Sequence, residues 1–135
     1  MSDSKMSEKW NIWKPTKDIP NTLYLEELRD TYDGLTLVFK GEDKDSRYIA
    51  IMFESALSYR NHDEGDLLKT FDNRGSNEIW PFFIIENSNY LKWFNEESHN
   101  IYEGRGVIHY FFVTPNDVID VLSAYPPIPK WVDSI

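Results

Sequence analysis

The sequence contains no cysteine, and this absence removes several kinds of chemistry at once. Disulfide bonds, thiolate nucleophiles and cysteine-ligated zinc or iron–sulfur centres all need that side chain. Basic residues are also scarce, since 14 lysines and arginines stand against 23 acidic residues and give a formal net charge of −9. This charge disfavours binding to nucleic acid or to anionic membrane surfaces. A charged partner is therefore expected to be basic.

Long apolar runs are missing as well. The first twenty residues have no apolar core of signal-peptide length, and no later run approaches the length of a membrane span. Together with the lack of cysteine, this predicts a cytoplasmic protein. The 135 residues, 41% of them hydrophobic, supply material for one packed domain. We expect a loosely ordered arm over residues 1–20, docked by Trp10 and Trp13, and a single domain over residues 21–135.

Alternating apolar and polar residues predict strands in the first half of the chain. Residues 35–40 and 47–54 both show a period of two and are rich in β-formers. The polar segment 41–46 between them predicts an antiparallel hairpin. Residues 23–30 fit either a helix or a strand, and we favour a strand.

The second half begins with a change of period. The nearly continuous apolar run 80–86 predicts a buried strand, and apolar residues then recur at helical spacing up to Ser98. Asn87 or Ser88 is placed to cap this helix.

The C-terminal third contains the clearest local signal. Residues 107–114 and 117–124 are rich in β-formers and are joined by Pro115-Asn116, which predicts a hairpin. Three prolines in residues 125–131 argue against a regular strand there. These elements predict an α+β fold, a single domain with a mostly antiparallel sheet of five or six strands and one or two short helices. The second helix would follow Gly65.

The segment YRNHDEGD, residues 59–66, concentrates the most reactive side chains. It contains His62, Asp63, Glu64 and Asp66, all of them acceptable metal ligands. Neighbouring residues of an extended chain point to opposite sides, however, and no second histidine lies nearby. The segment also lacks the ligand pattern of a calcium loop. We therefore expect no metal site, and the rest of the chain predicts no cofactor either.

Three other interpretations of this segment remain open. His62 with Asp63 or Glu64 could act as an acid–base pair, although no nucleophile motif accompanies it. Alternatively the segment is a tight turn, in which Arg60 pairs with Asp63 or Glu64 and Asp66 caps a following helix. A recognition surface is compatible with such a turn. His109 is expected to be buried and hydrogen-bonded, with a catalytic role as the less favoured alternative.

Negative charge is concentrated in the middle of the chain. Residues 61–103 carry nine acidic residues against Lys69, Arg74 and Lys92, a net charge of −6. Abundant aromatic residues belong mostly to the core, and one or two exposed ones could anchor a protein partner. An acidic patch beside such anchors suits the binding of a basic protein, while a solubilising role is the alternative.

Three segments together carry a resemblance to known proteins: YRNHDEGD, ENSNYLKWFNEES and HYFFVTPNDVIDVLS. In the order of its elements over roughly residues 25–128, the chain resembles small acidic bacterial immunity proteins, which are encoded beside toxins. The resemblance implies a function class, the stoichiometric neutralisation of a toxin, often a nuclease, and it transfers no residue roles.

We therefore predict a binding protein for a cognate, basic toxin, with no catalytic residue and no nucleic acid or membrane partner. The side chains expected to contact the toxin are polar residues of the middle third: His62, Asp63, Glu64, Asp66, Glu96, Glu97 and Glu103. The alternative is a small hydrolase or metal-assisted enzyme that uses His62 with Asp63 or Glu64. A third possibility is a subunit of a larger assembly. The sequence leaves the oligomeric state open.

Overall fold

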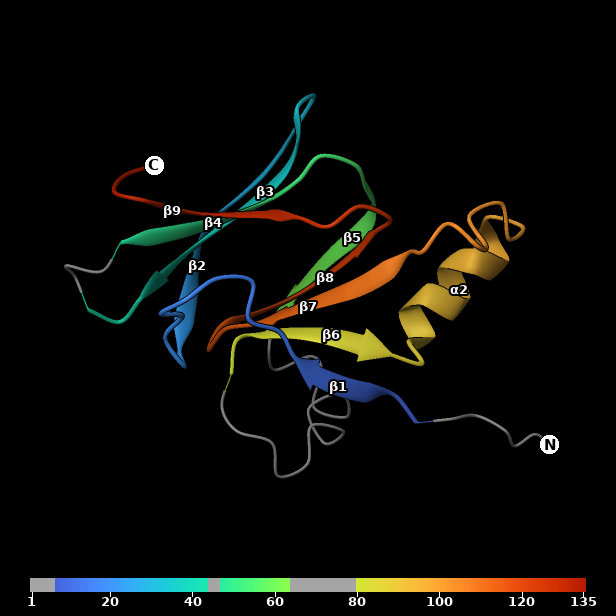
Figure 1. The fold of residues 1–135 in the computed structure, drawn as a ribbon, viewed down its shortest axis with the longest axis horizontal. Helices are drawn as coiled ribbons and strands as arrows, with labels where there is room; N and C mark the ends of the chain where they lie inside the picture. The colour runs from blue at the N-terminus through green and yellow to red at the C-terminus, as the bar shows by residue number, and fades with distance from the viewer. Residues whose placement is uncertain (1–6, 44–46, 64–79) are drawn as a thin grey trace.

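The structure, a computed structural model, describes residues 7–43, 47–63 and 80–135. Within these residues the chain forms two antiparallel sheets and one helix, α2 (Asn89–Glu97) (Figure 1). The first sheet has the strand order β1 (Lys9–Ile12), β6 (Phe82–Glu86), β7 (Ile108–Val113), β8 (Asp117–Ser123) and β5 (Ala56–Asp63). The second has the order β2 (Leu23–Thr31), β3 (Gly34–Gly41), β4 (Tyr48–Phe53) and β9 (Ile128–Val132).

The predicted fold class is wrong. The sequence led us to expect an α+β domain with one sheet of five or six strands, whereas the structure is mostly β, with a five-stranded and a four-stranded sheet. The only helix in the described part of the chain is nine residues long. The second helix, predicted after Gly65, falls outside the described residues.

Several local predictions are confirmed. Residues 35–40 lie in β3 and residues 48–53 of the predicted segment 47–54 form β4; the two strands make an antiparallel hairpin, and residues 23–30 belong to strand β2. The hairpin around Pro115-Asn116 is also present, as β7 and β8. Strand β6 runs into α2, and Ser88 caps that helix, because its side chain accepts a hydrogen bond from the backbone N–H of Leu91 at 2.9 Å.

One local prediction is wrong, and another is tested only in part. Residues 128–132 form β9 in spite of Pro129, because β9 is an edge strand and one side of an edge strand needs no backbone donor. Residues 59–63 belong to β5, which pairs with β8, so the part of the open turn interpretation that rests on Gly65 and Asp66 falls outside the described residues. Arg60 pairs with Asp120, and the predicted pairing with Asp63 or Glu64 falls outside the described side chains.

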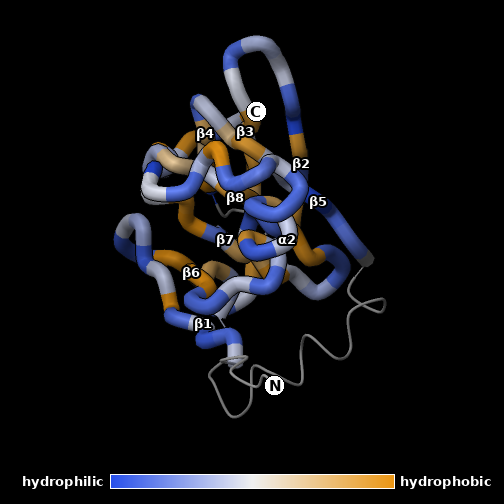
Figure 2. The backbone as a smooth tube through the Cα atoms, turned by 90° about the vertical axis from the view of Figure 1, so that its right-hand side faces the viewer, coloured by the Kyte–Doolittle hydropathy of each residue, from blue (hydrophilic) through white to orange (hydrophobic). Residues whose placement is uncertain are grey.

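The core lies between the two sheets. Rings from β3 and β4 meet rings from β6 and β7, and the centroids of Phe39 and Phe112 are 5.6 Å apart in a stacked arrangement. Phe82 packs edge-on against both of these rings. Figure 2 shows the hydrophobic stretches along β3, β4 and β6, whereas much of α2 is hydrophilic. Trp10 and Trp13 dock the N-terminal segment as expected: Trp13 packs on Phe82 and Phe112 between the sheets, and Trp10 packs on Phe111 on the outer face of the five-stranded sheet. Residues Lys9–Ile12 of the expected loose arm form the paired strand β1.

Candidate functional site

The candidate site lies on the face of the five-stranded sheet that turns away from the second sheet. Side chains alternate along a strand, so cross-strand partners share a face. Phe111 of β7 is paired with Asp120 of β8, and Asp120 is paired with Arg60 of β5. These three side chains therefore form a row across the sheet. His109 lies two residues from Phe111 and shares its face, whereas the neighbouring Tyr110 packs against Phe53 of the second sheet.

A chain of hydrogen bonds runs through this face. His109 Nε2 lies 2.5 Å from Oδ1 of Asp120, and His109 Nδ1 lies 2.7 Å from the hydroxyl of Ser88. The second carboxylate oxygen of Asp120 accepts a hydrogen bond from Arg60 Nε at 2.8 Å. His109 and Asp120 are buried, with exposed fractions of 3% and 1%. The prediction that His109 is buried and hydrogen-bonded is confirmed.

The donors and acceptors of this chain fit together without conflict. Asp120 as a carboxylate only accepts, so His109 Nε2 carries the proton of that bond. In the neutral imidazole, Nδ1 then accepts from the hydroxyl of Ser88. The same hydroxyl oxygen accepts from the backbone N–H of Leu91. The start of α2 is thereby tied through His109 to the middle of β8.

Tyr90 of α2 contacts this network through Arg60 and Ser58 of β5. The guanidinium of Arg60 lies over the Tyr90 ring, 4.1 Å from its centroid, and the Tyr90 ring stacks on Trp93 at 5.9 Å. The hydroxyl groups of Tyr90 and Ser58 are hydrogen-bonded. Burial raises the pKa of Tyr90 above its ordinary value of 10.0, against the lowering effects of Ser58 and Arg60. The phenol therefore keeps its proton at neutral pH.

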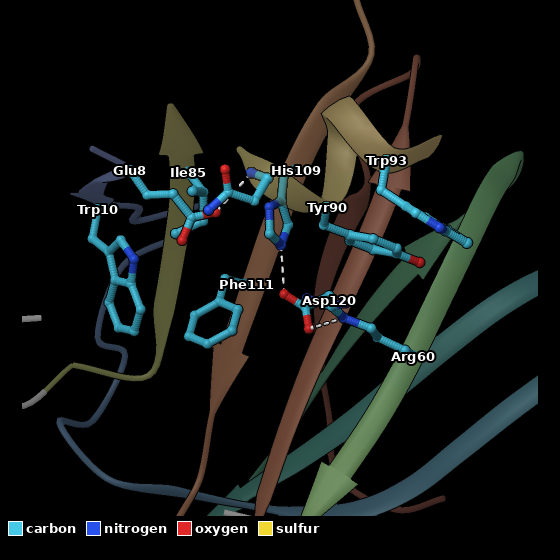
Figure 3. A pocket seen from close by; sticks show the side chains of 10 residues that line it. Glu8, Trp10, Arg60, Ile85, Tyr90, Trp93, His109, Phe111 and Asp120 are labelled. Atoms are coloured by element: carbon cyan, nitrogen blue, oxygen red, sulfur yellow. Dashed lines mark hydrogen bonds and ion pairs between the residues drawn. The ribbon is translucent and has the colours of Figure 1, made fainter. Parts of the chain in front are cut away.

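A cavity of about 320 Å³, which we call the outer pocket, opens between this network and β1 (Figure 3). Its walls include four aromatic rings, those of Trp10, Tyr90, Trp93 and Phe111. The polar side chains around it include Glu8, Arg60, His109 and Asp120. Glu8 accepts a hydrogen bond from the backbone N–H of Asn89 at 2.8 Å and so fixes the first turn of α2 at the rim.

The hydroxyl–imidazole–carboxylate sequence of Ser88, His109 and Asp120 contains the residue types of a nucleophilic triad. A nucleophile must reach its substrate, however, and Ser88 is buried, caps α2 and is not part of the pocket wall. The hydrogen bonds of Ser88 are those of a helix cap. The arrangement therefore holds the pocket wall in place and leaves no serine positioned to attack a ligand.

The residues predicted around His62 are placed only in part. His62 lies on β5 and is half-buried. It shares a face of the sheet with Arg60, because the two residues are two positions apart on the same strand. The backbone of Asp63 pairs with Asp117. Glu64 and Asp66 fall outside the described residues, so the predicted contact role of this acidic segment stays a prediction.

The other predicted contact residues lie around α2. Glu96 and Glu97 are exposed and follow Trp93 by three and four residues, which places all three on one side of the helix. Glu103 is exposed in the turns after the helix. Trp93 itself is 51% exposed. Sequence reasoning did not single out this tryptophan as the exposed ring beside the acids.

Sequence reasoning also missed the pairing of Arg60 with Asp120. The one available signal is that Asp120 stands inside the apolar run VIDVL, where a buried acid needs a partner. Sixty residues separate the pair, and nothing in the local pattern points to Arg60. Trp10 was expected only to dock the N-terminal segment, although it also forms part of the pocket wall.

Neither a metal centre nor a membrane helix emerges from residues 7–43, 47–63 and 80–135. They contain no group of three or more histidine and acidic side chains that could hold a metal ion. They also contain no helix long and apolar enough to cross a membrane. Comparison of the chain with protein-family models, with curated proteins and with solved structures found no match.

Proposed function

We propose that this protein is a cytoplasmic immunity-type protein that binds a basic toxin domain and neutralises it by forming a one-to-one complex. The proposed contact surface, here called the α2–β5 surface, combines aromatic, basic and acidic residues: Tyr59, Arg60, Trp93, Glu96 and Glu97. The observation that carries the proposal is the half-exposed indole of Trp93, held in a fixed stack beside two exposed glutamates.

The composition of this surface is that of an interface hot spot. Tryptophan, tyrosine and arginine dominate the residues whose truncation weakens protein complexes most. Trp93, Tyr59 and Arg60 line a shallow cavity of about 270 Å³ beside the outer pocket. A cavity bordered by such residues can receive a side chain of a partner.

The anchors of this surface are already held in place. Arg60 is 46% exposed, yet its guanidinium is fixed by Asp120 and by the ring of Tyr90. The hydroxyl of Tyr59 donates to Asp30 at 3.1 Å, which ties β5 to β2. Side chains that are fixed beforehand lose little conformational entropy on binding, so more of the contact energy contributes to affinity.

The negative charge of the protein indicates which class of partner it binds. Glu96 and Glu97 lie one turn after Trp93 on the same side of α2, and the whole chain carries a net charge of −9. A basic partner would be steered toward this protein, with an association rate that falls as salt screens the charges. The resemblance to immunity proteins supports the same partner class. We place His62 and Glu103 at the edge of the proposed contact.

The proposal is tested by capture followed by a functional assay. Tagged protein is used as bait in its source cells at low and at high salt, and the recovered protein is then expressed alone and together with this chain. We expect a basic protein in equal stoichiometry that arrests growth alone and is harmless in the presence of this chain. A recovered protein without toxicity, or toxicity that this chain does not relieve, contradicts the proposal.

Matched variants locate the contact. Trp93→Ala, and separately Glu96→Lys with Glu97→Lys, should weaken capture and protection at least tenfold, since each removes a predicted hot spot or reverses the steering charge. Tyr32→Ala and Glu42→Lys with Asp43→Lys make the same changes at exposed residues of the β2–β3 and β3–β4 turns. Equal effects of the two sets would remove the α2–β5 surface from the interface.

A further inference from the structure

The indole N–H of Trp10 has no hydrogen bond partner, although its nitrogen atom is buried. Trp10 is 7% exposed, and its ring packs against Phe83 and Phe111 at 5.3 Å and 4.7 Å. In Figure 3 the indole nitrogen lies on the side of the ring that is turned toward the other side chains of the outer pocket. A buried donor without an acceptor lowers the stability of a folded protein and is rare. Such a donor therefore suggests that a bound molecule supplies the acceptor.

None of the other polar groups of the pocket wall accepts this hydrogen bond. Asp120 is engaged by His109 and Arg60, and one oxygen of Glu8 accepts from the backbone of Asn89. Both ring nitrogens of His109 are bonded. These bonds hold the network in place, and a molecule inside the cavity can supply the acceptor that Trp10 lacks.

The shape and charge of the cavity select the kind of molecule. A volume of about 320 Å³ falls within the range of small-ligand sites. Aromatic walls favour a flat ring, because offset stacking and edge contacts add to the burial of area. Asp120 and Arg60 offset each other as an ion pair, so the remaining carboxylate, that of Glu8, disfavours an anion. The unpaired donor of Trp10 needs an acceptor, which a protonated ring nitrogen does not provide.

We infer that the outer pocket binds a flat, uncharged heteroaromatic ring whose ring nitrogen or carbonyl oxygen accepts the hydrogen bond of Trp10, the chemistry of a nucleobase. The ring lies among Trp10, Phe111, Tyr90 and Trp93. This site shares Arg60 and Trp93 with the α2–β5 surface. The inference does not rest on toxin binding, because the ligand is a free small molecule and its binding is measured without the toxin.

The inference is tested with two probes of the same shape. Quinoline and naphthalene differ in one ring nitrogen, so only quinoline can accept from the indole N–H, and quinoline is uncharged at pH 8. Each is titrated into the full chain labelled with ¹⁵N, and the five tryptophans give five indole signals. The signal absent from Trp10→Phe is that of Trp10. We expect it to shift with quinoline and with adenosine, and quinoline to bind roughly fivefold more tightly than naphthalene.

Variants and a charged probe complete the test. Trp10→Phe keeps a ring but removes the donor, so quinoline should bind roughly fivefold more weakly, whereas Trp131→Phe, on β9 in the other sheet, should leave affinity unchanged. The comparison of quinoline with naphthalene needs no variant and holds even if Trp10→Phe misfolds. Equal affinities of these two probes, a Trp10 signal that moves with neither quinoline nor adenosine, or tighter binding of adenosine monophosphate than of adenosine overturns the inference.

Discussion

The carboxylate of Asp120 lies 2.5 Å from the imidazole of His109, and this pair joins β8 to β7 within the buried part of the sheet. The same carboxylate receives Arg60 of β5, and the same imidazole contacts Ser88 at the start of α2. One acid therefore organises three strands and a helix around the outer pocket. Because Asp120, His109 and Ser88 are buried, substituting one of them should change the free energy of unfolding.

Asp120→Ala should lower the free energy of unfolding by about 2 kcal/mol, because it leaves the buried His109 N–H without its charged acceptor and releases Arg60. Urea unfolding followed by tryptophan fluorescence measures the change. Glu97→Ala removes an acid of α2 that is exposed, and it should change stability by less than about 0.5 kcal/mol. Equal losses in the two variants would mean that the Asp120 network contributes nothing specific.

Ser88→Ala should cost about 1 kcal/mol, since it removes the acceptor for the Leu91 N–H and the partner of His109 Nδ1. Amide hydrogen exchange gives the more specific measurement. The Leu91 amide should exchange faster in the variant, while amides in the middle of β3 should keep their relative protection. Unchanged exchange at Leu91 would contradict the capping role.

Gly34→Ala should destabilise the protein by about 3 kcal/mol or more. Gly34 has φ +131°, and an added Cβ would collide with the carbonyl oxygen of Phe53 on the neighbouring strand. Gly104→Ala is the matched control, because φ is +82° there but nothing lies near the added atom, so only backbone strain of about 1 kcal/mol is expected. Thermal unfolding of both variants measures the difference, and similar midpoints would show that the contact at Phe53 relaxes freely.

Stability should fall as the pH rises above about 10. Burial raises the pKa of Tyr90 and of Tyr110 above the ordinary value of 10.0, so the folded protein holds both phenolic protons after the unfolded chain has released them. The unfolded state then binds fewer protons, and the free energy of unfolding decreases with pH. Tyr110→Phe should show a shallower decrease between pH 9 and 11 in urea titrations. An identical slope would contradict the contribution of Tyr110.

Local pattern was sufficient to predict the strands that alternate cleanly and pair with a sequence neighbour. In β3 and β4, Leu37 and Ile51 face the core at strict period two, and a single polar turn joins the strands. The pattern failed where pairing is distant or where polar residues occupy the strand. In β5, Arg60 and His62 interrupt the apolar alternation, and the reason for Arg60 is Asp120, sixty residues away.

The same distinction applies to the candidate site. The acids of α2 could be predicted as a negative surface, because charge is a property of composition. The outer pocket could not, since Trp10, Tyr90 and Phe111 come together only through the pairing of β1 with β6 and of β6 with β7. Two sheets were not expected because β1 and β9 carry no strong strand signal of their own. Both are short edge strands whose pairing depends on a neighbour that is already formed.

The pairing of β4 with β9 also determines when folding can finish during synthesis. Residues 48–53 have to wait for residues 128–132, so the four-stranded sheet keeps an open edge until nearly all of these 135 residues have left the ribosome. Contacts of such long sequence separation form slowly. While β4 waits, its backbone N–H and C=O groups on that side are open to strands of other chains. A chaperone that holds extended segments would therefore be expected to raise the yield of folded protein more than it raises that of a truncated hairpin of β3 and β4.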